Sequence, residues 1–328
     1  MAKKTAFVTG ATGFLGTHIV NSLLRDGWHI TAFVRATSKT KALEERGVVC
    51  VVGQIRDAES IAAVMPSNVD AVFHAAAMLT LWQPKHAEQW EDNVTATEAM
   101  LTAARKKNAK KFVFVSSVSA YGYKHEYVHE GMPQEGDKSP VNYNRTKFAA
   151  EERVRAAVAE GLDAVIVNPA HIIGPYDHQA WSHFLILIAT NSLPAIPPGG
   201  GAFCYAPHVA DAIVAAAERG RTGANYLLGG GDATFYDFVM IASRLLGKNE
   251  TRQPLSPYLM GWIGWLNDLY SWLVTGTEPS LTYEGALKVS ANVKVSGTTA
   301  QDELGYKTMT LEESLPPTIE WLRANHYI

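Results

Sequence analysis

The chain lacks most of the features that would indicate a metal, disulfide, nucleic-acid or secreted protein. Cys50 and Cys204 are its only two cysteines, and they lie far apart without the spacing of a metal site. The net charge of −3 gives no attraction toward nucleic acid or an anionic membrane. The N-terminal stretch MAKKTAFVTGATG lacks the long apolar region and cleavage site of a signal peptide. We therefore expect a reduced, cytoplasmic protein without a disulfide framework.

The sequence also gives little support for a histidine metal site or for a membrane-spanning segment. His125 and His129 in HEYVHE are typical of a solvated loop, and no metal is expected. The most apolar long stretch, YLMGWIGWLNDLYSWLVTG at 258–276, carries Asn267 and Asp268 near its middle. Polar groups at that position argue against a transmembrane span and favour a buried or pocket-lining helix. Attachment to a membrane surface through the tryptophans is the alternative.

Short apolar runs alternate with longer amphipathic ones through the first half of the chain. The runs predict strands at 5–10, 29–35, 48–55, 71–77, 111–117 and 163–169, and the amphipathic stretches predict helices at 14–25, 57–65, 86–107 and 143–160. Continuous apolar strands separated by helices indicate an α/β fold with a Rossmann-type doubly wound parallel sheet. A ligand of such a sheet binds beyond the carboxyl ends of its strands.

The pattern also predicts how the chain is divided. Residues 1–169 form the dinucleotide-binding core, while 170–205 and 232–328 form a smaller, mostly helical substrate-binding lobe. The segment 206–231, which contains the strand-like run ANYLLGG, is expected to pack back onto the core.

A glycine-rich turn follows the first predicted strand, in FVTGATGFLG. Gly10 can form the tight turn, Gly13 allows the backbone to approach a pyrophosphate, and Gly16 allows helix and strand to pack closely. The N-terminus of the following helix offers free N–H groups to phosphate. A glycine triplet alone is weak evidence, but the strand before it and the helix after it predict dinucleotide binding.

The end of the second strand indicates which dinucleotide binds. NAD sites usually place an acidic residue there for the ribose hydroxyls. This chain instead reads FVRATSKTK, with Arg35, Ser38, Lys39 and Lys41 and no carboxylate before Glu44. Arginine at this position can pair with a 2′-phosphate, so NADP(H) is preferred over NAD(H), and a solvated basic loop is the alternative.

Tyr143 and Lys147 stand four residues apart in NYNRTKFAAEE, at the start of a predicted helix. Residues at i and i+4 share one helix face, so the phenol and the ammonium can address one spot. A nearby cation lowers the pKa of a phenol, which favours proton transfer near neutral pH. The spacing is common by chance on solvated helices, so the other motifs have to support it.

Taken in order, these motifs resemble those of the extended short-chain dehydrogenases/reductases over nearly the whole chain. The matching segments are TGATGFLG, FHAAA, EDNVTAT, FVFVSSVSAYG, YNRTK and NPAHIIGP. The branch that the chain resembles most contains the dihydroflavonol reductases and hydroxysteroid dehydrogenases. The resemblance implies cofactor contacts, besides the glycines, Arg35, Lys39, Tyr143 and Lys147, from Thr12, Phe14, Leu15, Gln54, Ile55, Ala75, Ala76, Ala77, Pro169 and Ile172. Gln54 replaces the aspartate that the family usually places against adenine.

The resemblance also implies reversible hydride transfer between a nicotinamide and a carbonyl or alcohol. Tyr143 would donate the proton, and Lys147 would bind the nicotinamide ribose. Ser117 would orient the substrate oxygen, and Asn93 would hold a water that relays protons to Lys147. Ser116 and Ser119 are the alternative candidates for the role of Ser117. Strand alternation turns Ser116 to the other side, however, and Ser119 lies further along the loop. A homodimer through the helices at 86–107 and 143–160 is common among such proteins.

Aromatic side chains after the sixth strand suggest an apolar or aromatic ketone or aldehyde as the small-molecule substrate. The candidate contacts are Leu81, Trp82, His171, Tyr176, Trp181, Phe184 and Tyr205, with His178 and His183 in the same loop. Cys204 aligns where nucleotide-sugar enzymes often carry a diphosphate-binding arginine. An NAD-dependent nucleotide-sugar epimerase or dehydratase, and a non-catalytic cofactor-sensing regulator, are the alternative functions.

Overall fold

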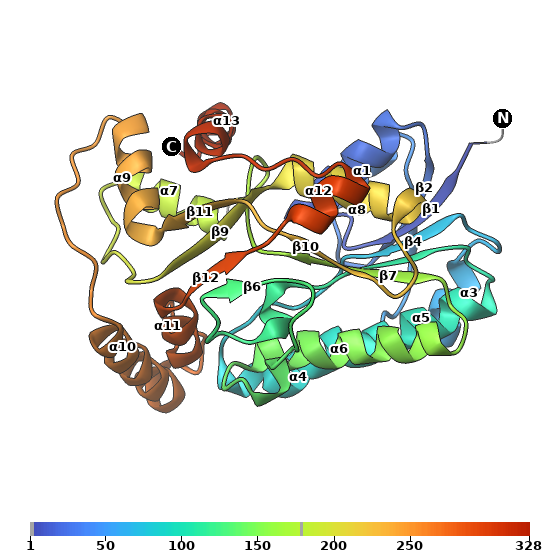
Figure 1. Ribbon diagram of the computed structural model, residues 1–328, viewed down its shortest axis with the longest axis horizontal. Coiled ribbons are helices and arrows are strands. Elements are labelled where there is room, and N and C mark those ends of the chain that lie inside the picture. Colours follow the sequence, from blue (N-terminus) through green and yellow to red (C-terminus); the bar gives the residue numbers. More distant parts are fainter. Residues whose placement is uncertain (1–2, 178–179) are drawn as a thin grey trace.

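The computed structural model describes residues 3–177 and 180–328. Its central layer is a seven-stranded parallel sheet in the order β10-β7-β5-β4-β1-β2-β3 (Figure 1). The strands are β1 (Thr5–Thr9), β2 (His29–Val34), β3 (Val49–Val52), β4 (Ala71–His74), β5 (Phe112–Val115), β7 (Ala164–Pro169) and β10 (Asn225–Leu228). The strand order reverses between β1 and β4, which is where a doubly wound sheet binds its ligand. The predicted parallel sheet is confirmed.

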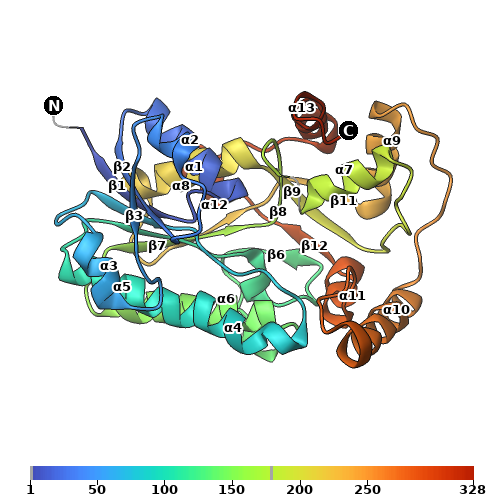
Figure 2. The same ribbon diagram turned by 180° about the vertical axis from the view of Figure 1, so that it is seen from behind.

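Helices cover both faces of this sheet (Figures 1 and 2). One face packs against α1 (Phe14–Arg25), α2 (Lys41–Glu44), α8 (Ala206–Arg219) and α12 (Thr298–Leu304). The other face packs against α3 (Ala58–Val64), α5 (Ala96–Lys106) and α6 (Asn142–Ala159). Because neighbouring side chains of one strand enter different cores, the strands read as continuous apolar runs.

The predicted helix at 86–107 consists of three segments in sequence. They are α4 (His86–Trp90), a π-helical turn η2 (Glu91–Thr95) and α5. A π-helical turn changes which side chains face the sheet, and such turns occur frequently at functional sites. Asn93 lies within this turn and is buried.

The second lobe contains a small sheet that the sequence pattern did not predict. Its order is β11-β9-β12-β6, and β8 pairs with β9. The strands are β6 (Tyr127–Val128), β8 (His171–Ile173), β9 (Gly200–Tyr205), β11 (Gly231–Thr234) and β12 (Asn292–Val295). β6 and β8 have only two and three residues, and β9 and β11 begin with glycine, so these strands lack the apolar run that marks the central strands.

Helices α7 (Trp181–Ala189), α9 (Phe235–Leu245) and α13 (Leu311–Ala324) surround a separate core with this small sheet. The remaining elements of the lobe are α10 (Pro257–Tyr270), a π-helical turn η5 (Ser271–Thr275) and α11 (Tyr283–Ser290). α11 meets α4 through Glu284 and His86 (3.0 Å), and α10 packs against α11. Short 3-10 turns complete the fold at η1 (Gln83–Lys85), η3 (Val118–Tyr121) and η4 (Gly136–Lys138).

The segment 206–231 contributes α8, which packs against α1, and β10, which forms an edge of the central sheet. The helix α12 also packs against α8 and β10, although its residues come from 232–328. The chain therefore returns to the core around the central sheet twice after it has first entered the second lobe.

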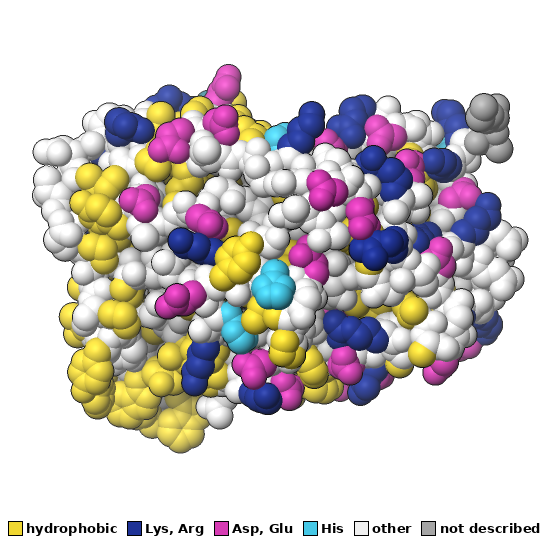
Figure 3. All heavy atoms as spheres, viewed as in Figure 1, with side chains coloured by type: hydrophobic (Ala, Val, Ile, Leu, Met, Phe, Trp, Pro, Cys, Tyr) yellow, Lys and Arg dark blue, Asp and Glu magenta, His cyan; other side chains and the backbone are white. Residues whose placement is uncertain are grey.

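The prediction of a buried or pocket-lining helix at 258–276 is wrong. Only Met260 and Gly264 of α10 are buried. Figure 3 shows the resulting apolar patch at its lower left, over α10; the exposed side chains are Tyr258, Leu259, Trp262, Trp265, Leu266, Leu269, Tyr270, Trp272, Leu273 and Val274. A Cβ on Gly264 would lie 2.6 Å from the carbonyl oxygen of Thr282, so α10 approaches α11 along one narrow side. No helix within 3–177 or 180–328 is long and apolar enough to cross a membrane.

Candidate active site

The turn between β1 and α1 requires its glycines. Gly10 has φ +75°, and a Cβ there would lie 2.9 Å from the backbone of Ala75. A Cβ on Gly16 would lie 1.9 Å from the carbonyl oxygen of Gly10. Gly13 caps α1 without a side-chain hydrogen bond, so the first N–H groups of this helix are open to an anion. This arrangement fits the pyrophosphate of a dinucleotide.

Basic side chains lie at the carboxyl end of β2. Arg35 and Lys39 are exposed, and neither forms an ion pair with any residue that the structure describes. Gln54 is also exposed and follows β3, where its backbone N–H donates to Ser60 Oγ (2.9 Å). A phosphate on the adenosine ribose would find cations here that no carboxylate neutralises.

Tyr143 and Lys147 lie on the buried side of the first two turns of α6. Their exposed fractions are 7% and 2%. Lys147 Nζ donates to the carbonyl oxygen of Val115 (3.0 Å) and lies 6.0 Å from the centroid of the Tyr143 ring. The two side chains therefore share one face of the helix, at the carboxyl end of β5.

Ser117 joins this pair from the end of β5. It hydrogen-bonds the Tyr143 phenol, and its Oγ accepts from the backbone N–H of Ser119 (3.2 Å). Ser116 Oγ instead donates to the buried Glu151 (2.5 Å), as strand alternation predicts. Among these serines, Ser117 is the one whose hydroxyl meets the phenol.

Burial controls the protonation of the two titratable groups. Desolvation raises the pKa of Tyr143 to about 12, although the hydrogen bond from Ser117 opposes this. Desolvation lowers the pKa of Lys147 to about 8, and the nearby Glu151 opposes it. The pKa of Tyr143 is thus raised rather than lowered as expected, because desolvation of the buried phenol is the largest influence on it. The phenol keeps its proton at neutral pH.

Asn93 fastens the loop after β4 to α6. Its Oδ1 accepts from the backbone N–H of Met78 (2.7 Å), while its Nδ2 lies 3.0 Å from both Met78 O and Thr146 Oγ1. Thr146 precedes Lys147 on α6. The π-helical turn therefore places Asn93 next to the lysine-bearing segment.

A cavity of ≈ 450 Å³ extends from the glycine turn to these residues. Phe14, Leu15, Ala75 and Ala77 line its cofactor side, together with Pro169 and Ile172, and Ser117, Tyr143 and Lys147 line its centre. The far wall is largely apolar and includes Leu79, Leu81, Trp181 and Phe184. The cavity is therefore continuous from the dinucleotide motif to the proton-transfer residues.

Four of the proposed substrate contacts line this cavity, namely Leu81, His171, Trp181 and Phe184. Burial lowers the pKa of His171 to about 3, so its ring acts as a neutral part of the wall. His178 lies outside the described residues, and His183 is exposed on α7.

Three other proposed contacts do not line the cavity, because each packs elsewhere. Trp82 is buried just before η1, and its backbone N–H donates to Thr80 Oγ1 (3.3 Å). Tyr176 packs against His18 and Trp321, and Tyr205 packs against His208. Ring type alone predicted these contacts, and none of the three residues is among those that line the cavity.

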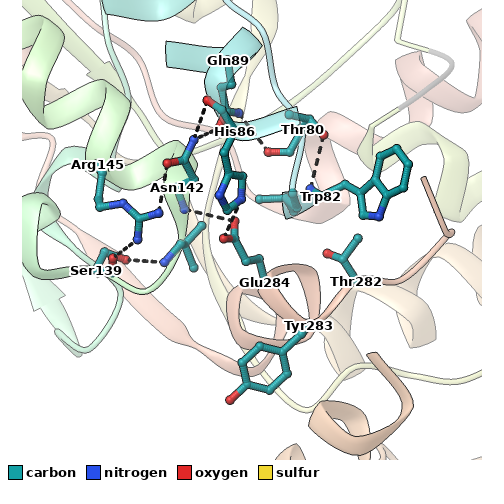
Figure 4. Close-up of polar contacts among 12 residues, drawn as sticks. Thr80, Trp82, His86, Gln89, Ser139, Asn142, Arg145, Thr282, Tyr283 and Glu284 are labelled. Atoms are coloured by element: carbon teal, nitrogen blue, oxygen red, sulfur yellow. Dashed lines mark hydrogen bonds and ion pairs between the residues drawn. The ribbon is translucent and has the colours of Figure 1, made fainter. Parts of the chain in front are cut away.

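Figure 4 shows the polar network that fixes the start of α6. The side chain of Asn142 donates to Gln89 Oε1 (2.8 Å) and accepts from Arg145 (3.0 Å). Its backbone N–H donates to Glu284 Oε2 (3.0 Å), and His86 Nε2 lies 3.0 Å from Glu284 Oε1. Glu284 comes from α11, so the second lobe holds the N-terminus of the helix that carries Tyr143.

The sequence analysis missed Glu284 and Lys288. Lys288 lines the cavity, and its Nζ lies 4.7 Å from the centroid of the Tyr143 ring. The i, i+4 spacing of the two residues in TYEGALK was a visible signal, but no pattern shows which helix faces the cavity. Cys204, aligned with a diphosphate-binding arginine, is fully buried in β9, with its Sγ 3.4 Å from the carbonyl oxygen of His171.

Metal ligands do not gather at this site. Within the described ranges, no group of three or more His, Cys, Asp or Glu side chains could hold a metal ion. His125 instead contacts the Glu135 carboxylate at 3.4 Å.

Known proteins share both the sequence pattern and the fold. The NAD dependent epimerase/dehydratase family matches residues 6–229. A Synechocystis protein provisionally named dihydroflavonol 4-reductase is 27% identical, over 98% of this chain and 95% of its own. Sterol demethylase protein B from Methylococcus capsulatus is 28% identical, over 97% and 98%. A nucleoside-diphosphate-sugar epimerase from Pseudomonas aeruginosa superposes with a TM-score of 0.80 at 23% identity, over 100% of both chains.

The fold and the family match together define an enzyme class whose members act with a nicotinamide dinucleotide. The chain belongs to the NAD-dependent epimerase/dehydratase family, whose match covers more than half of it. This membership confirms the resemblance to the extended short-chain dehydrogenases/reductases, and it makes the protein an oxidoreductase of that family.

Proposed function

We propose that the protein is an NADP(H)-dependent carbonyl reductase, or alcohol dehydrogenase in the reverse direction. The observation that carries this proposal is the convergence of Ser117, Tyr143 and Lys147 in a cavity with apolar walls. Aromatic and aliphatic walls suit an apolar or aromatic ketone or aldehyde.

Each residue would have a separate role in the reduction of the carbonyl group. A bound nicotinamide supplies or accepts the hydride. Tyr143, whose raised pKa keeps the phenol protonated up to alkaline pH, donates its proton to the oxygen of the reduced carbonyl. Ser117 orients that oxygen through the same hydroxyl that contacts the phenol, and Lys147 holds the ribose hydroxyls. Asn93 fixes the loop and helix beside Lys147 and holds the relay water.

The preference for NADP(H) is supported by Arg35 and Lys39. Both are exposed just beyond β2, and neither pairs with a carboxylate within the described part of the chain. A 2′-phosphate would supply the missing anion, whereas the ribose hydroxyls of NAD(H) would leave both cations unpaired.

Two other functions use the same scaffold. A nucleotide-sugar epimerase or dehydratase is favoured by the likeness to the Pseudomonas aeruginosa enzyme, but the apolar walls and the buried Cys204 suit a diphosphate poorly. A non-catalytic cofactor sensor would not need the converging Ser117, Tyr143 and Lys147. A homodimer through α4–α5 and α6 belongs to the same proposal.

The test is oxidation of NADPH and NADH with a panel of apolar ketones and aldehydes, measured for the wild type and Tyr143→Phe. We expect turnover with a higher kcat/KM for NADPH. Loss of the phenolic proton donor should lower kcat by about 10²–10⁴-fold. Tyr127→Phe is the matched control, because Tyr127 is an exposed tyrosine away from the cavity.

Turnover that persists in Tyr143→Phe would contradict the assigned proton donor. Turnover with nucleotide sugars, and with none of the ketones, would replace the reductase by the epimerase. Cofactor binding without any turnover would favour the sensor.

A further inference from the structure

Lys288 brings a second cation to Tyr143. Its Nζ lies 4.7 Å from the centroid of the phenol ring, closer than the 6.0 Å of Lys147 Nζ. The two lysines come from different lobes, since α6 carries Lys147 and α11 carries Lys288. The position of Lys288 in the cavity therefore depends on how the second lobe packs against the core.

This packing is fixed by acidic side chains. Glu284, one turn before Lys288, accepts from the backbone N–H of Asn142 at the start of α6 (3.0 Å; Figure 4). Glu278 accepts from Thr80 Oγ1 in the loop after β4 (2.9 Å). The first contact holds α11 against the start of α6, and the second ties the segment before α11 to the loop after β4. Lys288 on α11 is therefore a positioned residue of the cavity wall.

Lys288 has no carboxylate in direct contact among the described residues, and Glu284, one turn away, only partly offsets the desolvation of its ammonium. Its ammonium donates to Ser119 Oγ (3.3 Å), and it forms no ion pair with a carboxylate of the described residues. The oxygens of Glu284 face Asn142 and His86 instead (Figure 4). Desolvation accordingly lowers the pKa of Lys288 to about 8. A cation that is partly desolvated and incompletely paired gains free energy when an anion binds beside it.

The surroundings indicate which anion fits. The cavity walls near Lys288 are mainly apolar, with Val289, Trp181 and Phe184 among them. A diphosphate carries more charge than one lysine and one serine hydroxyl can satisfy, whereas a single carboxylate matches this pair. The rest of the ligand should be apolar.

We propose that Lys288 binds a carboxylate of the substrate, next to the carbonyl or alcohol carbon that Tyr143 addresses. This inference rests on the proposed oxidoreductase function and names its substrate class: keto acids, or hydroxy acids in reverse, with an apolar or aromatic remainder. Lys288 is then the residue that distinguishes acids from neutral ketones.

Binding can be measured without turnover. We would determine the affinities of 3-phenylpropionate and its uncharged amide by calorimetry, with NADPH present, for the wild type and Lys288→Met. A charge-assisted contact predicts that the wild type binds the carboxylate about 10-fold to 100-fold more tightly than the amide. Lys288→Met should bind both equally. Lys294→Met is the matched control, because Lys294 is an exposed lysine of the same lobe outside the cavity.

A kinetic experiment separates this inference from the proposed function. Oxidation of 3-hydroxy-3-phenylpropionate and of its methyl ester by NADP⁺ should show a KM advantage for the acid that disappears in Lys288→Met. Lys288→Gln serves as a second variant, and thermal unfolding shows that both variants are folded.

Equal affinity of the wild type for the carboxylate and the amide, or a preference that survives in both Lys288 variants, would overturn the carboxylate site. Turnover of neutral ketones would still support the reductase in that case. A Lys288-dependent preference without any turnover would support the site and contradict the reductase.

Discussion

The helices α6 and α10 show opposite relations between composition and burial. α6 reads NYNRTKFAAEERVRAAVA, rich in polar and charged residues, and nine of its 18 residues are buried. α10 reads PYLMGWIGWLNDLY, which is largely apolar, and two of its 14 residues are buried. Burial of a helix therefore follows from what the tertiary structure packs against it, and composition alone gave the wrong expectation for α10.

The physical cause differs between the two helices. α6 packs beside α5 on one face of the central sheet, and a buried carboxylate holds it there. Glu151, with no exposed surface, accepts from Ser116, Gln134, Arg155, Asn168 and Asn225. α10 meets α11 along the side that contains Gly264, while its aromatic side chains face outward.

The largest effect on stability in this comparison of α6 with α10 is expected from substitution of Glu151. In Glu151→Ala, several buried donors lose their acceptor and Arg155 loses its buried partner. We expect the free energy of unfolding to fall by about 3–5 kcal/mol, measured by urea denaturation. Glu152→Ala is the control, because Glu152 pairs with the same arginine (2.6 Å) at an exposed position, and its loss should amount to about 0–1 kcal/mol. Equal losses in the two variants would show that the buried network does not hold α6.

An intermediate effect is expected on kcat/KM when the pH changes the protonation of Lys147 on α6. Burial disfavours the charged form of Lys147, so its proton is lost as the pH rises through about 8, whereas Tyr143, with a pKa of about 12, stays protonated. Reduction of a neutral ketone should therefore fall by about tenfold per pH unit above 8. The measurement is a kcat/KM profile between pH 6 and 10 in Lys288→Met, because Lys288 titrates in the same range. A flat profile up to pH 10 would contradict a role for the Lys147 charge.

The smallest effect is expected on α10 and the turn that follows it. Trp272 is 71% exposed, so Trp272→Ser should change the free energy of unfolding by less than about 0.5 kcal/mol. Val154→Ala on α6 removes fewer atoms than Trp272→Ser does. Because Val154 is fully buried, Val154→Ala should nevertheless lower the free energy of unfolding by more. Urea denaturation of the two variants compares them directly. A larger loss for Trp272→Ser would mean that the apolar face of α10 is covered in solution.

The parts of the fold that the sequence predicted are those with strong local signals. The central strands are buried on both faces, so their apolar runs are continuous, and β1, β4 and β5 begin within one residue of the predicted starts. The small second sheet was missed because β9 and β11 begin with glycine and β6 and β8 have only two and three residues. The three glycines of the first turn were predictable, since backbone approach at Gly10 and Gly16 leaves no room for a side chain.

The site residues also fall into two groups, those that local sequence patterns predicted and those that only the folded structure brings together. Tyr143 and Lys147 share a helix face by spacing alone, and Ser116 was separated from Ser117 by strand alternation. Trp82, Tyr176 and Tyr205 were proposed from residue type, and packing against other elements removes them from the cavity wall. Lys288 could not be found, because its approach to Tyr143 is a contact over 145 positions of sequence.

By itself the sequence determined the parallel sheet, the glycine turn and the tyrosine–lysine pair, because each depends on neighbours within a few residues. The tertiary structure decided the protonation of Tyr143, the exposure of α10 and the second lysine of the cavity. Desolvation and contact between distant elements are properties of the assembled chain, since they depend on which surfaces the folded molecule brings together.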